Sequence, residues 1–274
     1  MRCLLVLPAL IAFASFAYAD VKYVTIQGQV KWNGDKAPAA ELVNFKGHVD
    51  QPACCKDGKT LASTDVEVDA KSLGLKNVVV WLRPDDKVKE NTFPLNKVKP
   101  DLLKVKSKEH VIDQPMCLFE PKITIARAGD TLVVKNSSKI GHNVNYSSDI
   151  ESQNSLLPAG AELKPKLPLA AQRTPIAVAC NIHPWMTAKV RVFDHPYYAL
   201  TDKDGKFEIK DVPVGTWRIV YQHESGIHQG TPEGKLGHLG FPITIKGDKA
   251  TMEMEAMKMQ FQVKPKETDP PKEK

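Results

Sequence analysis

Residues 175–193 read Pro-Ile-Ala-Val-Ala-Cys-Asn-Ile-His-Pro-Trp-Met-Thr-Ala-Lys-Val-Arg-Val-Phe. The stretch begins and ends with runs rich in small and β-branched residues, which predict two strands. Between them, a short loop carries the Cys180 thiol, the His183 imidazole and the Met186 thioether at three-residue intervals. The stretch therefore predicts a β structure in which one tight loop presents three side chains that can bind a metal.

The rest of the chain repeats this pattern of short strands separated by turns, at the spacing typical of small β-sandwiches. Asn33-Gly34, which follows the first alternating run, is a strong hairpin signal. No helical periodicity is sustained anywhere, so the pattern predicts an all-β protein. The expected strands are 24–32, 77–82, 123–126, 131–136, 175–180, 187–193, 197–201, 206–210, 216–223, 241–245 and 250–263.

The composition is that of an ordinary soluble chain. At 274 residues it can form one large or two ordinary domains. With 42% hydrophobic and 26% charged residues, collagenous and wholly disordered classes are excluded. The net charge of +6 is spread over much of the chain and is too mild to indicate nucleic-acid binding.

The first twenty residues have the pattern of an export signal. Arg2 precedes an apolar run over 4–16, and Ala17-Tyr18-Ala19 forms a small-x-small cleavage site before Asp20. We therefore expect residues 1–19 to be a signal peptide cleaved after Ala19, and the mature protein to be periplasmic or secreted. No later stretch is apolar enough to predict a membrane span. Residues 264–274 are rich in proline and alternating charge, and predict a disordered tail.

Four cysteines remain after the expected cleavage: Cys54, Cys55, Cys117 and Cys180. An even number in an exported protein suggests two disulfides, but a bridge between the neighbours Cys54 and Cys55 would be strained. The simplest alternative pairs Cys117 with Cys54 or Cys55 and leaves Cys180 for metal binding. The sequence contains no Cys-x-x-Cys-His, which excludes a c-type haem.

The donor types on the loop match one kind of metal site. A thiolate and two imidazoles in a trigonal set, with a weak axial thioether, form the ligand field of blue copper. The second imidazole is expected from His142, which follows the strand expected at 131–136. Such a loop would hold the ligands in place in both oxidation states, and we expect the edge of His183 to lie near the surface, where an electron can enter.

The Cys-x-x-His-x-x-Met loop with an upstream His-Asn-Val resembles the cupredoxins, with a loop length closest to amicyanin-type members. The resemblance covers about 122–192 and implies a Greek-key β-sandwich that transfers single electrons with a redox protein partner and catalyses no reaction. It also implies that Asn143 braces the ligand loop. The region 21–108 departs from a minimal cupredoxin by a long insertion that contains two cysteines. The ligands that the resemblance implies for one type 1 copper are His142, Cys180, His183 and Met186.

Other sites fit the loop less well. Zinc also binds Cys and His, but the Met186 thioether contributes little to that ion. A binuclear copper site would need a second cysteine in the loop, and multicopper oxidases and nitrite reductases use His-x-His pairs that the sequence lacks. A Cys-His nucleophile pair would need an orienting Asn or Asp and oxyanion donors, and nothing near the loop resembles them.

A second resemblance begins after the loop region. Residues 201–207, followed by 212–216, resemble the carboxypeptidase regulatory-like domain, a small transthyretin-like sandwich that serves for binding or as a spacer. The expected organisation is therefore a cupredoxin domain with an N-terminal insertion over 20–195 and this second sandwich over 196–263. The Asp202-x-Asp204-Gly205 sequence departs from a calcium loop and predicts a turn instead.

Two further hypotheses involve residues outside the loop. A periplasmic copper carrier or storage protein could use two Met-x-Met pairs to bind Cu(I), although methionines that fill the core of a final strand explain the same pattern. A surface binding module would carry the copper site incidentally. His48 and the other remaining histidines are expected to be surface or hydrogen-bonded residues. The methionines concerned are Met252, Met254, Met257 and Met259.

Overall fold

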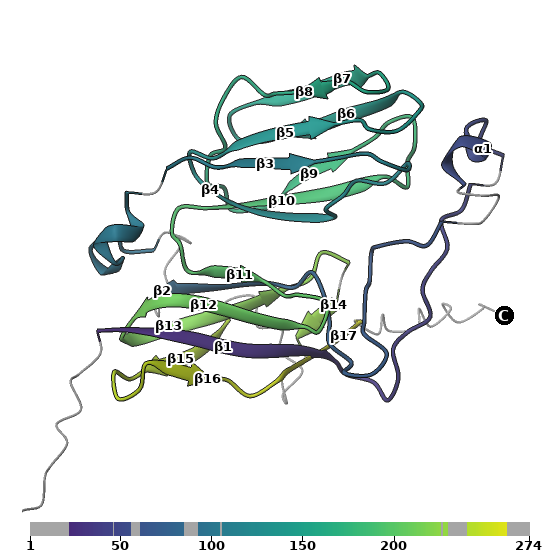
Figure 1. Ribbon diagram of the computed structural model, residues 1–274. Helices are drawn as coiled ribbons and strands as arrows, with labels where there is room; N and C mark the ends of the chain where they lie inside the picture. The colour runs from purple at the N-terminus through teal and green to yellow at the C-terminus, as the bar shows by residue number, and fades with distance from the viewer. Residues whose placement is uncertain are drawn as a thin grey trace, which may run out of the picture.

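The computed structural model describes residues 22–45, 47–55, 61–84, 93–104, 106–225, 227–229 and 240–261. As the sequence predicts, the chain is all-β, and the four sheets of the described residues form two stacked sandwiches (Figure 1). The expected signal peptide and the expected tail both lie outside the described residues. No helix of the described part is long and apolar enough to cross a membrane.

The upper sandwich in Figure 1 contains the loop that carries the candidate ligands. A five-stranded sheet, in the order β4-β10-β9-β6-β7, packs on a three-stranded sheet, β3-β5-β8. Valines that alternate along these strands, such as Val134, Val144 and Val178, are fully buried in the core between them. The strands are β3 (Glu109–Ile112), β4 (Ile123–Arg127), β5 (Thr131–Lys135), β6 (His142–Ser147), β7 (Ser152–Leu157), β8 (Glu162–Leu163), β9 (Ile176–Ala179) and β10 (Thr187–Phe193).

The lower sandwich has a core of its own, which includes Ile26, Leu82 and Ile219. One of its sheets has the order β12-β1-β17-β14, with β16 also pairing with β1, and the other has the order β11-β2-β13-β15. Its strands are β1 (Tyr23–Trp32), β2 (Val79–Pro84), β11 (Tyr198–Leu200), β12 (Lys206–Pro213), β13 (Gly215–Gln222), β14 (Ile227–Gln229), β15 (Phe241–Ile245), β16 (Thr251–Glu253) and β17 (Met257–Phe261).

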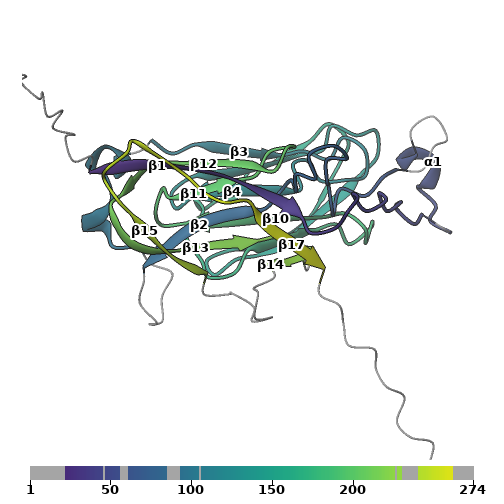
Figure 2. The ribbon, with the colours of Figure 1, turned by 90° about the horizontal axis from the view of Figure 1, so that it is seen from below.

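The sheets divide the chain differently from the boundary expected at residue 196. Both β1 and β2 were expected in the cupredoxin domain, but β1 pairs with β12 and β2 pairs with β13. Figure 2 shows β1 beside β12 and near the C-terminal strand β17. The physical reason is that an apolar alternating strand fits either core, so its partner is decided by long-range packing. The lower sandwich therefore contains strands from both ends of the chain.

The hairpin expected at Asn33-Gly34 is also wrong. The neighbours of β1 are β12, β16 and β17, and residues 33–36 form bends with no returning strand. A hairpin needs a second strand directly after its turn, and the irregular segment that follows supplies none. After β1, the chain instead crosses to the upper sandwich and returns before β2, with Phe45 in the upper core and Leu75 in the lower core.

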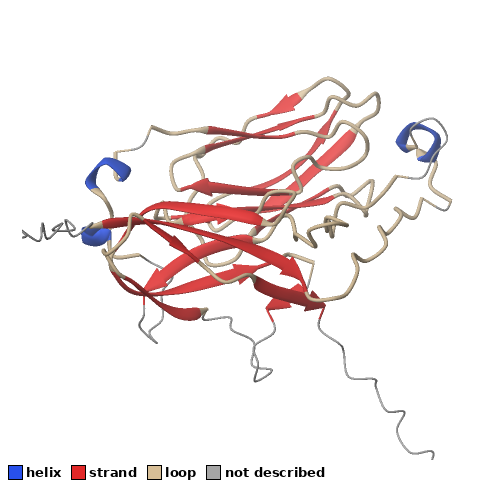
Figure 3. Cartoon of the chain, turned by 60° about the horizontal axis from the view of Figure 1, so that its bottom comes forward, coloured by secondary structure: helices blue, strands red, loops and turns tan. Residues whose placement is uncertain are grey.

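In the described residues, helical structure is confined to short segments at the edges, drawn blue in Figure 3. Helix α1 (Gln51–Cys54) lies beyond one end of the upper sandwich. Two 3₁₀ turns, η2 (Leu95–Lys97) and η3 (Pro100–Leu102), lie in a lysine-rich segment, residues 85–110. Part of that segment lies outside the described residues, and Phe93 and Val98 are buried in the lower core.

Candidate metal centre

The loop 180–186 joins β9 to β10 at one end of the upper sandwich. The Cys180 N–H donates to the Met186 carbonyl at 3.1 Å, and the Met186 N–H donates to the His183 carbonyl at 2.9 Å. These bonds close the loop on itself, while its two ends are fixed by the antiparallel pairing of β9 with β10. The local sequence therefore folds into a compact turn whose side chains are held in place by the sheet.

His142 joins this loop from a neighbouring strand. It is the first residue of β6, which pairs with β9. The His142 Nδ1 lies 2.9 Å from the His183 Nδ1, which lies 3.7 Å from the Cys180 Sγ. One donor atom from each of the three side chains lies within 4.8 Å of the others, and all three residues are buried. The structure thus brings together two imidazoles and one thiol that the sequence separates.

Met186, the fourth expected ligand, is fully buried in the same core as Cys180. Met186 is the last residue of the loop, directly before β10. Its carbonyl and its N–H form the two backbone hydrogen bonds that close the loop. A thioether at this position can serve as a weak axial donor, and it can equally fill the core.

Asn143 makes the contacts expected of a residue that braces the loop. Its backbone N–H donates to the Cys180 Sγ at 3.2 Å, and its side-chain oxygen accepts the Asn181 N–H at 3.0 Å. Its side-chain nitrogen donates to the Asn154 oxygen on β7 at 2.8 Å. Because these bonds tie the thiol and the loop to β6 and β7, Asn143 restrains the position of the sulfur.

Burial keeps both imidazoles neutral near pH 7. Burial and the nearby His183 lower the pKa of His142 to about 4. Burial also lowers the pKa of His183, although the Asp50 carboxylate acts in the opposite direction. A metal binds the neutral imidazole through a free lone pair, so these pKa shifts keep both rings in the form that a metal ion requires.

His183 is not the surface residue that the sequence led us to expect. Its ring is 0% exposed, and the Asp50 Oδ2 lies 3.1 Å from its Nε2. The His48 and Trp185 rings also pack against it, with centroid distances of 5.0 and 5.2 Å. The cover comes from residues 47–55, which we call the cap. Asp50, and the place of His48 over the loop, could not be predicted from the sequence, because a short polar segment contains no periodic signal that places it over a distant loop.

A disulfide ties the cap to the upper sandwich. It joins Cys54 to Cys117, one of the two pairings that the sequence left open, and Cys55 is free. Trp185 of the ligand loop donates its indole N–H to the Cys117 carbonyl at 3.1 Å. The two disulfide sulfurs and one ring nitrogen of His183 all lie within 4.8 Å of one another. The bridge therefore fixes the cap directly beside the candidate metal ligands.

The four methionines near the C-terminus line the other sandwich. Met259 is fully buried in the lower core, and Met252, Met254 and Met257 are partly buried against it. Tyr221 donates its hydroxyl to the Met254 sulfur at 3.8 Å. These contacts fit the interpretation of the methionines as core residues.

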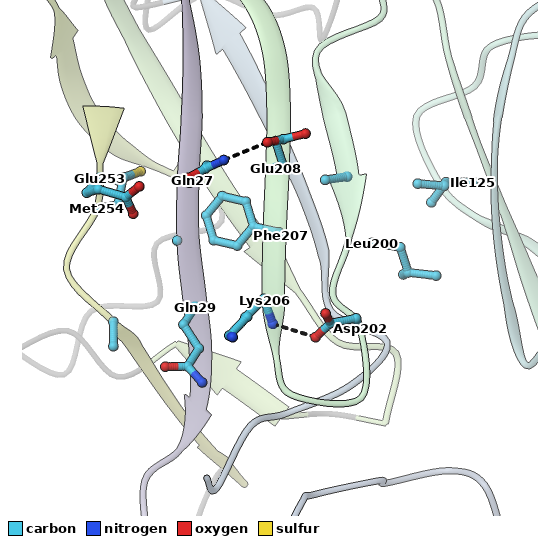
Figure 4. A pocket seen from close by; sticks show the side chains of 13 residues that line it. Gln27, Gln29, Ile125, Leu200, Asp202, Lys206, Phe207, Glu208, Glu253 and Met254 are labelled. Atoms are coloured by element: carbon cyan, nitrogen blue, oxygen red, sulfur yellow. Dashed lines mark hydrogen bonds between the residues drawn. The ribbon is translucent and has the colours of Figure 1, made fainter. Parts of the chain in front are cut away.

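A groove of about 900 Å³ lies between the two sandwiches, away from the metal ligands (Figure 4). Ile125 of β4 lines one side, and residues of β1, β12 and the segment after β16 line the other. Gln27 donates to the Glu208 carboxylate at 2.6 Å within the groove, and Asp202 accepts the Lys206 N–H at 2.8 Å. Of the three carboxylates that line the groove, those of Asp202 and Glu208 are therefore paired with neighbouring groups.

Comparison with known proteins gives partial matches to solved structures. The chain matches no protein-family model and no curated protein. An amicyanin mutant in its reduced state is 20% identical over 30% of this chain and 80% of its own, with a TM-score of 0.27. A purple cupredoxin from Nitrosopumilus maritimus is 18% identical over 32% of this chain and its own full length, with a TM-score of 0.26. The likeness concerns the fold of about a third of the chain.

Proposed function

We propose that the upper sandwich binds one copper ion of the type 1 kind and exchanges single electrons with a redox protein partner. The observation that carries the proposal is the convergence of the His142 Nδ1, the His183 Nδ1 and the Cys180 sulfur in a buried cluster. Two imidazoles and a thiolate are the trigonal donors of blue copper. Met186 would supply the axial thioether from the same loop.

The donor set fits copper better than zinc. The His142 Nε2 is buried without a hydrogen-bond partner among the described residues, so its ring is oriented by the cluster on its Nδ1 side. Structural zinc sites use four strong donors, whereas this cluster offers three and a buried thioether. A bound copper ion would supply a one-electron couple between Cu(II) and Cu(I). Soft sulfur suits the reduced ion, and imidazole suits both.

The chain's own contribution is rigidity. A site that transfers electrons quickly must change little between oxidation states, and here the backbone bonds of the loop, the Asn143 contacts and the cap restrain each ligand. The three donor residues are buried, and on this proposal the protein is a carrier of electrons rather than an enzyme. On this proposal the protein works in the periplasm or outside the cell, and the lower sandwich serves as a binding or spacer module.

Spectroscopy of the full chain with added Cu(II) tests the proposal. We expect an intense visible thiolate-to-copper band and a narrow hyperfine splitting in electron paramagnetic resonance. Cys180→Ser should lose both signals, and Cys55→Ser, which removes the other free thiol of the described residues, should keep them. A wild-type protein that binds copper without the visible band, or binds only zinc, would refute the proposal.

The rate of metal release distinguishes the proposed function from the runner-up hypothesis, a copper carrier or storage protein. A carrier should lose its copper to a competing chelator within the time of mixing, whereas a buried electron-transfer site should retain the metal through repeated oxidation and reduction. The burial of His142 and His183 favours retention. A binding module that carries copper incidentally should bind its partner equally well with and without the metal.

A further inference from the structure

We propose that Asp50 of the cap is a positioning residue that fixes the His183 ring and its tautomer for metal binding. The inference rests on the proposed copper site and adds a residue from the insertion, which the cupredoxin resemblance does not cover. Its basis is the contact between the Asp50 Oδ2 and the His183 Nε2, 3.1 Å apart, on the side of the ring opposite the cluster.

In a neutral imidazole, the contact with Asp50 decides which ring nitrogen carries the proton. A neutral ring has one N–H and one lone pair, and a carboxylate can only accept. The Asp50 contact therefore places the His183 proton on Nε2 and leaves the lone pair on Nδ1. That Nδ1 is the atom facing the His142 Nδ1 and the Cys180 Sγ. Carboxylates that accept the distal N–H of a metal-binding histidine fix the ring and raise its basicity.

The second imidazole of the cluster provides an internal contrast. The His142 Nε2 is buried and has no hydrogen-bond partner among the described residues. In the metal-free protein, His142 therefore carries its proton on Nδ1 and donates it to the His183 Nδ1 across 2.9 Å. Of the two rings, only His183 has a carboxylate behind it. We infer that His183 is the ring whose orientation is fixed before metal binds.

Asp50 is itself held in place by the cap. Its backbone N–H donates to the His48 Nδ1 at 3.2 Å, and its carbonyl accepts the Cys54 N–H at 3.0 Å. Cys54 is bonded to Cys117, and the His48 Nε2 lies 3.0 Å from the Ile182 carbonyl of the ligand loop. These contacts restrain the backbone of Asp50, and they connect it to the disulfide through Cys54 and to the ligand loop through His48. The His48 Nδ1 also lies 3.9 Å from the Asp50 Oδ2.

A metal-free measurement tests the positioning role directly. In the full-length metal-free protein with ¹⁵N-labelled histidine, nuclear magnetic resonance should show His183 protonated on Nε2. Asp50→Ala should convert His183 to a mixture of tautomers, Asp50→Asn should have an intermediate effect because its amide oxygen still accepts, and Gln51→Ala should match the wild type. Gln51 is the exposed neighbour of Asp50 in α1, so it controls for damage to the cap. An unchanged His183 tautomer in Asp50→Ala would overturn the proposal.

A second readout uses the metal. Loss of an outer carboxylate partner typically weakens metal binding by about 10–100-fold. If the loss falls on Cu(II) alone, the reduction potential of Asp50→Ala should rise by about 59 mV for each tenfold. Equal Cu(II) affinity and equal potential in the wild type and Asp50→Ala would contradict the proposal. A wild-type protein without the thiolate-to-copper band would instead refute the copper site, and the metal-free tautomer would still decide the role of Asp50.

Discussion

The two sandwiches each contain a fully buried methionine, and the two sites differ in everything around it. Met186 lies at the end of the upper sandwich in a core shared with a free thiol, and it belongs to the loop whose His183 meets His142 of β6 in a buried cluster. Met259 lies in the lower core among aliphatic and aromatic side chains. A thioether is a flexible apolar filler in one setting and a soft ligand in the other. Its neighbours decide which role applies.

The first difference between the two sandwiches is the disulfide of the upper one. The upper sandwich has a disulfide with a sequence separation of 63, and the described part of the lower sandwich has none. Replacing both Cys54 and Cys117 with alanine should lower the free energy of unfolding by about 4 kcal/mol, because closing a loop of that length restricts the unfolded chain. Chemical denaturation measures this loss, and Cys55→Ser should leave the free energy almost unchanged. An equal loss in Cys55→Ser would contradict the assigned pairing.

Acid should act on both sandwiches, because burial lowers the pKa of His142 in the upper one and of His223 in the lower one. Burial lowers the pKa of His223, which follows β13 of the lower sandwich, to about 4, whereas the unfolded chain titrates near 6.5. Between these two pKa values the unfolded state binds more protons, so stability is lost as the pH falls from about 6.5 to 4. The loss should reach about 3 kcal/mol. Denaturation of the metal-free protein at several pH values measures it, and His223→Gln should flatten the dependence. A slope unchanged by that substitution would show that other groups cause it.

The smallest expected effects sharpen the comparison of the methionines. Met186→Leu and Met259→Leu nearly conserve volume, so each should cost less than about 1.5 kcal/mol of stability. Only Met186→Leu should change the reduction potential and the spectrum of the copper-loaded protein, because only that thioether lies beside the proposed ligands. Voltammetry of the two variants measures this. A shifted potential in Met259→Leu would contradict the assignment of the C-terminal methionines to the core.

The strands and the types of donor side chain could be predicted from local sequence. The pairing of strands and the position of the cap depend on long-range packing. The strands on either side of the loop were predicted because β-branched runs carry their own signal. The pairing of β1 with β12 could not be predicted in the same way, because strands that lie side by side in a sheet can be far apart in the sequence. The cap over His183 was missed for the same reason, since Asp50 is held there by a disulfide and by contacts with a loop far along the chain.

The central claim is that copper is held by two imidazoles and one thiolate of the upper sandwich, and not by the methionines of the lower one. X-ray absorption at the copper edge, on full-length protein loaded with one equivalent of copper, tests it in both oxidation states. We predict two nitrogen ligands and one short copper–sulfur bond in Cu(II), and the same set in Cu(I). A shell of thioether sulfurs without nitrogen in Cu(I), or no short sulfur in Cu(II), would contradict the account.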